Sequence, residues 1–490
     1  MTTWFVPALV VFPLLVNAQT TAADSLRMDW SHQLSVSRST PTLQVVVNPP
    51  LRFSSAIHDS VWETLRQLKG EYVRYVPWLP YPRLAVAELK PPSNGRCYWD
   101  FSLIDPMTKD FLQATRGHRF ILNFSTIPAW MFRSTQTVSY PESPDSVTWN
   151  YTQGTLPVDS SYQQIAAYYR RLVSWYTRGG FTDECGTYHA SGNHFHIPYW
   201  EVFNEPDQEH HPEPEIYTRE YDAVVGAIRS VSPDTRFVGM ALASENDPHW
   251  FEYFLNHKNH RPGIPLDMIS YHFYAIGYPG QGIESMQYSF FDQANGFLNS
   301  VRYIESIRRR LSPRTRTSID EIGSILSSDF DSSSPEIPAQ YWNLSAALYA
   351  YLYIQLTRIG IDVIGESQLL GYPSQYPSVS MVNWTSGRGN ARYWALKIIR
   401  DNLGPGDVLV AGGAEGTEGL EVQGFLTPAG KRILVVNRSA RPATLAVPAD
   451  FRAGQFLRVD PSSGERMPAP ESIGSKDLVL GPFGVAILRP

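Results

Sequence analysis

Two glutamates close apolar segments in positions that suit carboxylate chemistry. Glu205 directly follows the segment 199–204 and precedes Pro206, and Glu321 lies near the end of the segment 317–322. Cleavage of a glycosidic bond needs two carboxyl groups on opposite sides of the anomeric carbon, one to protonate the leaving oxygen and one to attack carbon or activate water. A single glutamate at a strand end is usually a surface or salt-bridged carboxylate. The prediction of a catalytic site therefore depends on the presence of both glutamates. We predict that Glu205 and Glu321 form this catalytic pair.

Short apolar segments alternate with amphipathic stretches from residue 43 onward, which predicts eight strand–helix pairs. The predicted strands are 43–48, 72–78, 120–125, 199–204, 236–243, 268–274, 317–322 and 362–368. The predicted helices are 55–68, 101–115, 161–178, 215–231, 248–257, 287–311, 341–358 and 390–403. A doubly wound open sheet is the alternative, but it usually has fewer units and often a glycine-rich nucleotide loop, which follows none of these strands. We therefore predict an α/β fold, a (β/α)8 TIM barrel over residues 43–404, which would gather the strand ends at one face.

The segments on either side of the barrel have a different pattern. Residues 405–490 contain short strand-like runs separated by Gly, Pro and Ser, which predicts a β-sandwich accessory domain packed against the barrel. Residues 19–42 precede the first barrel strand. Their strand-like part, 33–36, could join the sheet of the β-domain.

The N-terminus has features of a secretory signal peptide. An apolar run over 4–16 is followed by Val16-Asn17-Ala18, whose spacing of small residues suits signal peptidase. The absence of Lys and Arg before Arg27 departs from the usual pattern. We predict a signal peptide over 1–18, and hence a secreted, extracellular protein.

Composition limits the classes of partner. The net charge of −6 and the pI near 6.1 provide no basic surface for nucleic acid or an anionic membrane. The aromatic content of 13% fits a carbohydrate partner, because sugar sites use aromatic faces. No cofactor or catalytic metal is implied. Cys97 and Cys185 are expected in loops at opposite ends of the barrel, which argues against a disulfide, although long loop excursions could bring them together.

Several motifs resemble those of glycoside hydrolase clan A, and within it family 39. The segment 200–206, WEVFNEP, is similar to the acid/base motif of the clan, and the segment 320–323, DEIG, to its nucleophile strand. The segment 269–274, ISYHFY, is similar to the family's sixth strand, and Arg74 matches an arginine of the second strand. The resemblance covers about residues 43–404 and implies net retention through a covalent glycosyl–enzyme, with Glu205 as general acid/base and Glu321 as nucleophile.

The resemblance also implies supporting roles. Asn204 would bind the sugar 2-hydroxyl, Arg74 would support the nucleophile, and His272 and Tyr274 would line the site. Trp384 is a candidate for the sugar-stacking tryptophan after the eighth strand. The clan often has a histidine on the third strand, and the segment 120–125 has none; Asn123 or Trp130 could occupy that region.

Other residues are weaker candidates. Trp78, at the end of the second strand, is as well explained by ordinary packing as by a place in the pocket wall. Glu366, at the end of the eighth strand, could bond a sugar hydroxyl or form a structural salt bridge. Strand alternation directs Asp320 away from Glu321, so we expect it to be a supporting residue.

The segment after Glu205 is rich in potential metal ligands: Asp207, Glu209, His210 and His211. No tetrahedral set of ligands converges in the sequence, so we expect a solvated loop here and no metal site.

The prediction is a retaining hydrolase of O-glycosidic bonds, acting on a β-linked glycoside or polysaccharide. Glu205 should have a raised pKa, and Glu321 should stay ionised beside Arg74. A transglycosidase would use the same residues. A non-catalytic carbohydrate-binding barrel would usually lack one of the two glutamates. The sugar stays open, since a uronic acid would need a cation such as Arg388 in the pocket, and the sequence does not place it there.

Overall fold

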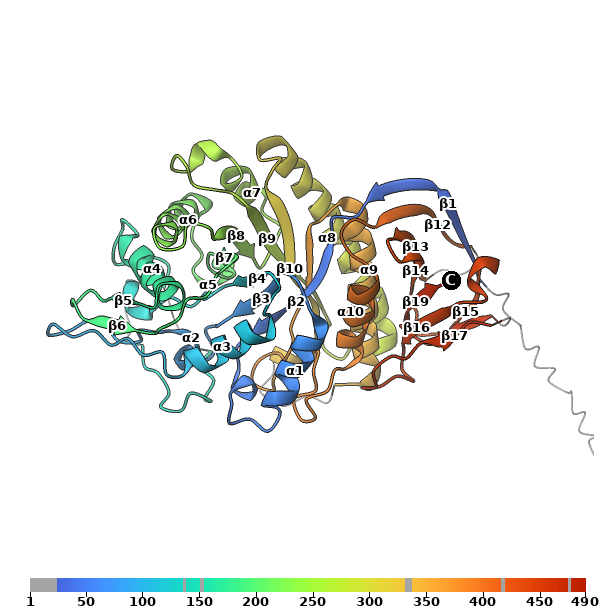
Figure 1. The fold of residues 1–490 in the computed structure, drawn as a ribbon, viewed down its shortest axis with the longest axis horizontal. Helices are drawn as coiled ribbons and strands as arrows, with labels where there is room; N and C mark the ends of the chain where they lie inside the picture. The colour runs from blue at the N-terminus through green and yellow to red at the C-terminus, as the bar shows by residue number, and fades with distance from the viewer. Residues whose placement is uncertain (1–23, 135–137, 150–153, 331–336, 416–418, 475–476) are drawn as a thin grey trace, which may run out of the picture.

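The chain forms a closed barrel of eight parallel strands beside a separate nine-stranded sheet (Figure 1). The computed structural model describes residues 24–134, 138–149, 154–330, 337–415, 419–474 and 477–490. The predicted signal peptide, 1–18, lies outside the described residues.

The barrel strands follow one another in chain order, and the last pairs with the first to close the ring. They are β2 (Thr40–Val46), β3 (Val73–Val76), β4 (Phe120–Leu122), β7 (Tyr199–Glu201), β8 (Arg236–Leu242), β9 (Met268–Ile276), β10 (Arg316–Ile325) and β11 (Val363–Glu366). Each overlaps one of the eight predicted strands. The predicted (β/α)8 barrel is confirmed.

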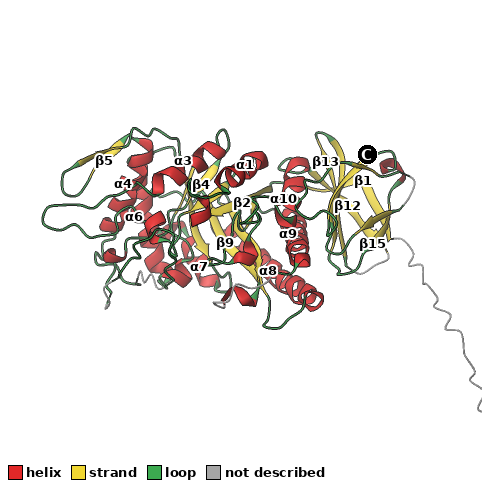
Figure 2. Cartoon of the chain, turned by 90° about the horizontal axis from the view of Figure 1, so that it is seen from below, coloured by secondary structure: helices red, strands yellow, loops and turns green. Residues whose placement is uncertain are grey.

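Helices surround the barrel strands (Figure 2). The principal ones are α1 (His58–Leu68), α3 (Ile104–Ala114), α4 (Gln163–Thr177), α6 (Pro214–Arg229), α7 (Pro248–Phe254), α8 (Ile283–Leu311), α9 (Ala339–Ile359) and α10 (Ala391–Asn402). Two short helices lie in strand-to-helix loops, α2 (Pro82–Ala85) and α5 (Pro206–Glu209). Among the described residues, no helix is both long and apolar enough to cross a membrane.

Helix α9 contacts the barrel strands β10 and β11 on one side and the separate sheet on the other (Figure 1). Its sequence is apolar almost all round, from Leu344 to Leu356, which is the pattern of a helix buried on every side. This helix joins the two parts of the molecule into one continuous core.

The separate sheet has the order β17-β16-β19-β14-β13-β12-β1-β15-β18. Its strands are β1 (Asp24–Val36), β12 (Val408–Glu415), β13 (Leu420–Thr427), β14 (Gly430–Asn437), β15 (Ala443–Ala446), β16 (Gln455–Val459), β17 (Glu471–Ser472), β18 (Leu478–Leu480) and β19 (Val485–Arg489). The strand-like segment 33–36 lies in β1, which pairs with β12 and β15. Alternate residues of β14 face different cores: Ile433 lies in the sheet's own core, and Leu434 lies in the core shared with the barrel.

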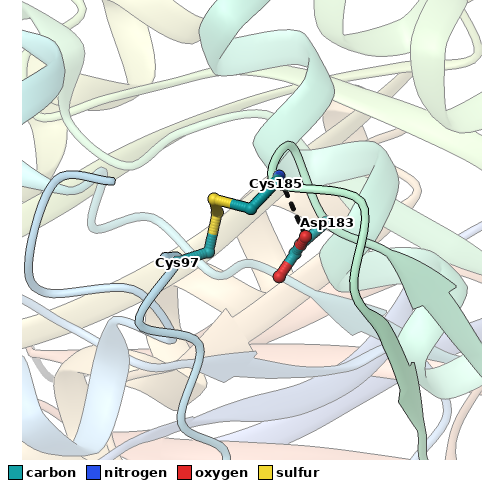
Figure 3. Close-up of side chains that lie close together, drawn as sticks. All are labelled: Cys97, Asp183 and Cys185. Carbon is teal, nitrogen blue, oxygen red and sulfur yellow. Dashed lines mark hydrogen bonds between the residues drawn. A yellow bond between two sulfur atoms is a disulfide. The ribbon is translucent and has the colours of Figure 1, made fainter. Parts of the chain in front are cut away.

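A two-stranded hairpin, β5 (Gly180–Thr182) and β6 (Tyr188–Ala190), projects between α4 and β7. Its tip carries Cys185, which forms a disulfide with Cys97 over a Cα–Cα distance of 6.0 Å (Figure 3). The expectation that the two cysteines lie apart is wrong. The reason is that the long β3–α3 loop, which holds Cys97, extends outward and meets the hairpin.

Candidate active site

Arg74, on β3, is fully buried at the centre of the site. Its Nη1 lies 2.5 Å from Oε1 of Glu321, and its Nη2 lies 2.7 Å from Oδ1 of Asn204. The guanidinium also donates to Glu201 and Gln44. Burial opposes the charge of Arg74, but the surrounding carboxylates outweigh it and raise the pKa of the guanidinium. Arg74 is therefore a fixed cation beneath the predicted nucleophile.

Glu321 is held at both carboxylate oxygens. Arg74 donates to Oε1, and the Tyr274 hydroxyl donates to Oε2 over 2.7 Å. Tyr274 also contacts the hydroxyl of Ser367. Two hydrogen bonds hold the carboxylate in a single orientation, as a nucleophile requires.

A β-bulge in β10 places Asp320 and Glu321 in one network. In the register with β9, Ser318 lies opposite Ser270, but Glu321 lies opposite His272, so β10 contains one extra residue. Strand alternation is interrupted there. The prediction that Asp320 points away from Glu321 is wrong: Asp320 Oδ1 lies 3.5 Å from Nε2 of His272, and its Oδ2 lies 3.9 Å from Nε of Arg74.

Glu205 follows β7 at the start of α5. Its φ of +41° lies in the left-handed region, and Phe203, two residues earlier, has a φ of +67°. Such conformations are uncommon for residues with side chains and gather at functional sites. The Glu205 N–H donates to the carbonyl of Ala241 over 2.9 Å, which fixes the turn.

His272 joins the two predicted catalytic carboxylates. Its Nδ1 lies 2.9 Å from Oε1 of Glu205 and 3.6 Å from Oε2 of Glu321. Burial opposes the charge on the ring, but the carboxylates, led by Glu321, raise the pKa of His272 to about 10. The imidazolium favours ionised Glu205, yet burial outweighs this effect, and the pKa of Glu205 is raised. That is the direction a general acid needs.

The carboxylates of Glu205 and Glu321 are close together. One oxygen of each, with Nδ1 of His272, lie within 4.8 Å of one another. Such a trio could ligate a cation only by displacing the proton that the surrounding carboxylates stabilise on His272. The geometry therefore favours proton transfer and carboxylate attack.

A cavity of about 130 Å³ lies directly above these groups. Its lining residues come from the ends of several barrel strands and the loops after them: Gln44, Val46, Val76, Trp78, Asn204, Glu205, Tyr274, Glu321, Ile325, Gln368, Tyr376 and Val379. Among these described residues none is Lys or Arg. The predicted residues Asn204, Glu205, Tyr274, Glu321 and Trp78 thus share one cavity, with Arg74 and His272 directly behind it.

Aromatic rings form one wall of the cavity. Trp78 stacks on Tyr376 with ring centroids 6.2 Å apart, and the two rings meet Trp149 edge to face, each at 5.6 Å. Trp149 is 45% exposed, so this cluster extends from the cavity to the surface. The sequence is compatible with Trp78 either as an ordinary packing residue or as part of the pocket wall. The structure favours the pocket wall.

Glu209 is a site residue that the sequence analysis missed. Its Oε1 accepts from Nε1 of Trp78 over 2.6 Å and from Nδ2 of Asn204 over 3.1 Å. Burial raises the pKa of Glu209 to about 8. A signal was present in the sequence: Pro206 favours the first turn of a helix, which places residue 209 one turn from Glu205.

The neighbours of Glu209 are also packed rather than solvated. Asp207 accepts from the backbone N–H groups of Ala243 and Ser244, and His210 is buried with its Nδ1 2.9 Å from the carbonyl of Gly154. The expectation of a solvated loop is wrong for Asp207, Glu209 and His210, which connect α5 to the adjacent loops, whereas His211 is exposed.

Asn123 occupies the third-strand position. Its Nδ2 donates to Glu201 over 2.6 Å and to the carbonyl of Phe203 over 2.8 Å, so it supports the strand that carries Glu205. Trp130 donates instead to the carbonyl of Glu88 and does not line the cavity.

Three candidates lie elsewhere. Glu366 is fully buried and pairs with Arg392 at 3.0 Å, which is the structural salt bridge of the two alternatives. Trp384 lines a different cavity, beside the β-domain, because the β11–α10 loop carries it outward. Arg388 is largely exposed and pairs with Glu465.

No known protein-family profile matches this chain, and no curated protein sequence matches it. Solved structures share its fold. The GH51 arabinofuranosidase from Xanthomonas axonopodis pv. citri has a TM-score of 0.65 at 12% identity, covering 95% of this chain and 99% of its own. A monomeric β-xylosidase from Caulobacter crescentus CB15 has a TM-score of 0.59 at 15% identity, with coverage of 95% and 99%. A GH30 endoxylanase from Clostridium papyrosolvens C71 has a TM-score of 0.53 at 12% identity, again over 95% and 99%.

Proposed function

We propose that this protein is a retaining glycoside hydrolase of clan A, with Glu205 as general acid/base and Glu321 as nucleophile. The observation that carries the proposal is the approach of the two carboxylates to within 4.8 Å beneath one cavity. Retaining enzymes place their carboxyl groups about 5–5.5 Å apart, whereas inverting enzymes leave about 6.5–9.5 Å for a water molecule. Because the 4.8 Å bound joins single oxygens and not the centres of the carboxyl groups, the proposal of retention rests on the resemblance of WEVFNEP and DEIG to the clan A motifs.

The surroundings of each carboxylate suit its role. Glu205, with its raised pKa, would donate a proton to the leaving oxygen while Glu321, oriented by Arg74 and Tyr274, attacks the anomeric carbon. Burial is the main cause of the raised pKa of Glu205, and repulsion by Glu321 adds to it; formation of the glycosyl ester removes the charge of Glu321 and so lowers the pKa of Glu205. Ionised Glu205 can then take a proton from a water molecule. The oxygen of that water attacks the anomeric carbon, the ester bond to Glu321 breaks, and Glu321 leaves as the carboxylate.

The cavity indicates the kind of sugar. It has no Lys or Arg among its described lining residues, so a uronic acid would bury its carboxylate without a free cation. Its volume of about 130 Å³ is well below the roughly 300–1,000 Å³ of ordinary ligand pockets. We therefore propose that the cavity takes one neutral sugar ring from a β-linked glycoside or the end of a polysaccharide chain.

The finer family assignment rests on the sequence motifs alone. Those motifs resemble family 39, while the fold neighbours carry the names arabinofuranosidase (GH51), β-xylosidase and endoxylanase (GH30). These names support pentosides as the first substrates to test. A transglycosidase remains the alternative, because the same two carboxylates would transfer the sugar to an acceptor hydroxyl.

We also propose that the protein is secreted. The disulfide between Cys97 and Cys185 supports an oxidising compartment, in agreement with the predicted signal peptide.

The proposal is tested with aryl β-xyloside, β-glucoside, β-galactoside, α-L-arabinofuranoside and α-L-iduronide, following the first-formed product by proton NMR. We expect cleavage of at least one neutral glycoside with the anomeric configuration retained, and none of the iduronide. A product of inverted configuration would exclude the mechanism. Absence of cleavage of every glycoside and of soluble xylan would exclude the function.

A further inference from the structure

A second, larger cavity of about 470 Å³ lies between the barrel and the β-domain. Its walls are the first turn of α9, the loop between β11 and α10, and the loop between β16 and β17. The volume lies within the range of small-molecule sites. Such sites occur preferentially where two domains meet.

The wall combines aromatic faces with an unsatisfied polar group. Trp342 and Trp384 line the cavity, and both are only partly buried. Asn343, which lines it too, is 5% exposed, and its Nδ2 has no hydrogen-bond partner among the described residues. A buried amide donor without an acceptor is costly, and a bound ligand that supplies an acceptor would relieve that cost.

The described lining of the cavity favours uncharged ligands. Among the described lining residues only Glu465 is charged. Its Oε1 accepts from Asn383 over 2.7 Å, and its Oε2 accepts from Ser386 and pairs with Arg388 at 3.2 Å. The carboxylate is thus neutralised within the protein, and among the described lining residues no free cation or anion faces the cavity. A ligand that suits this wall is uncharged, has an apolar face and carries hydroxyl groups.

The second cavity and the candidate active site share one loop. Gln368 and Val379 line the catalytic cavity, and Val382 and Trp384 line the second one, all on the β11–α10 loop. The first turn of α9 follows β10, so it also lies at the end of the barrel where the strands finish. Both cavities therefore lie toward the same end of the barrel.

We infer that this second cavity binds a neutral saccharide, a unit of the substrate distant from the bond that is cleaved. The choice of a saccharide over another neutral polyhydroxy ligand rests on the proposed function. Trp384 and Trp342 supply stacking faces, and Asn343 donates to a sugar hydroxyl or ring oxygen.

The test measures binding of xylohexaose by isothermal titration calorimetry in the full-length Glu321→Gln variant, which does not turn the probe over. In that background, Trp384→Ala removes a stacking face, and Asn343→Leu removes the amide at similar volume. Trp30→Ala, a partly buried tryptophan of β1 outside both cavities, is the matched control, and circular dichroism checks that each variant folds.

We expect both cavity variants to weaken binding about tenfold or more and the control to leave it unchanged. Unchanged affinity in both cavity variants, or no binding of xylohexaose to the Glu321→Gln protein, would overturn the inference. Stronger binding of an alkyl detergent than of xylohexaose at this cavity would overturn it as well. Binding that depends on Trp384 in a protein that cleaves no glycoside would refute the proposed hydrolase while leaving this second site in place.

Discussion

Arg74 and Glu321 form a buried ion pair, with Nη1 of the arginine 2.5 Å from Oε1 of the glutamate. The pair joins β3 to β10, which are not neighbours in the barrel. Because Arg74 also contacts Asn204, a single cation positions both the proposed nucleophile, Glu321, and the residue before the proposed acid/base, Glu205. The orientation of the site therefore depends on one residue that does not itself line the cavity.

Replacing Arg74 should reduce both stability and activity. Arg74→Met leaves Glu201, Asp320 and Glu321 buried without their cation, and loss of one partner from a buried pair costs about 3–5 kcal/mol. Urea unfolding should show a loss of this size. Arg66→Met, which breaks an exposed pair with Glu63, should cost less than about 1 kcal/mol. Similar losses in the two variants would contradict the central role of Arg74.

Replacing His272 should change the pH dependence of catalysis. The imidazolium favours ionised Glu205, so the neutral side chain of His272→Gln should raise the pKa of Glu205 further. The alkaline limb of kcat/KM, which reports loss of the acid's proton, should then move to higher pH. His249→Gln, at an exposed histidine of α7, serves as the control. An alkaline limb that stays in place or moves to lower pH would show that His272 does not act on the acid.

Glu209 should make stability depend on pH. Its folded pKa of about 8 lies above the ordinary value of 4.5, so the native state binds the extra proton between these two values. The stability that protonation provides is complete below about pH 4.5 and is lost as the pH rises through 8, at up to about 1.4 kcal/mol per pH unit. Glu209→Gln cannot titrate, so its unfolding free energy should fall less between pH 5 and pH 8 than that of the wild type. Parallel curves for the two proteins, with exposed Glu142→Gln as control, would mean that Glu209 is not protonated in the native state.

The disulfide should contribute to stability. Cys97 and Cys185 are 88 residues apart, and removal of a native disulfide typically costs about 2–5 kcal/mol. Reduction with dithiothreitol should lower the Tm of the wild type. The double variant Cys97→Ala/Cys185→Ala should have the Tm of the reduced wild type, whether or not dithiothreitol is present. A wild-type Tm that does not respond to full reduction would contradict this contribution.

The barrel could be predicted from the sequence because its elements have strong periodicity. Each of the eight apolar segments became a barrel strand, and the motifs located Glu205 and Glu321 at strand ends. The local pattern is enough to predict such features, because the carboxyl ends of all strands in a parallel barrel lie at the same face of the barrel.

Features that depend on local distortion or on long loops could not be predicted in this way. The bulge in β10 adds one residue to the strand, and no residue pattern in the sequence predicts it. Because of the bulge, Asp320 and Glu321 contact the same network of side chains. The path of the β3–α3 loop brought Cys97 to Cys185, and the path of the β11–α10 loop brought Tyr376 to the catalytic cavity but carried Trp384 away from it. Such paths depend on tertiary packing rather than on the residues of the loop alone.

The most direct test of the two catalytic roles is azide rescue of Glu205→Ala and Glu321→Ala on whichever aryl glycoside the wild type cleaves. The account predicts that Glu205→Ala gives a glycosyl azide of retained configuration, because azide replaces water in the second displacement. It predicts that Glu321→Ala gives an azide of inverted configuration, because azide takes the space of the missing carboxylate and attacks directly. Wild-type rates in either variant, or the same anomer from both, would contradict the assignment of Glu205 as acid/base and Glu321 as nucleophile.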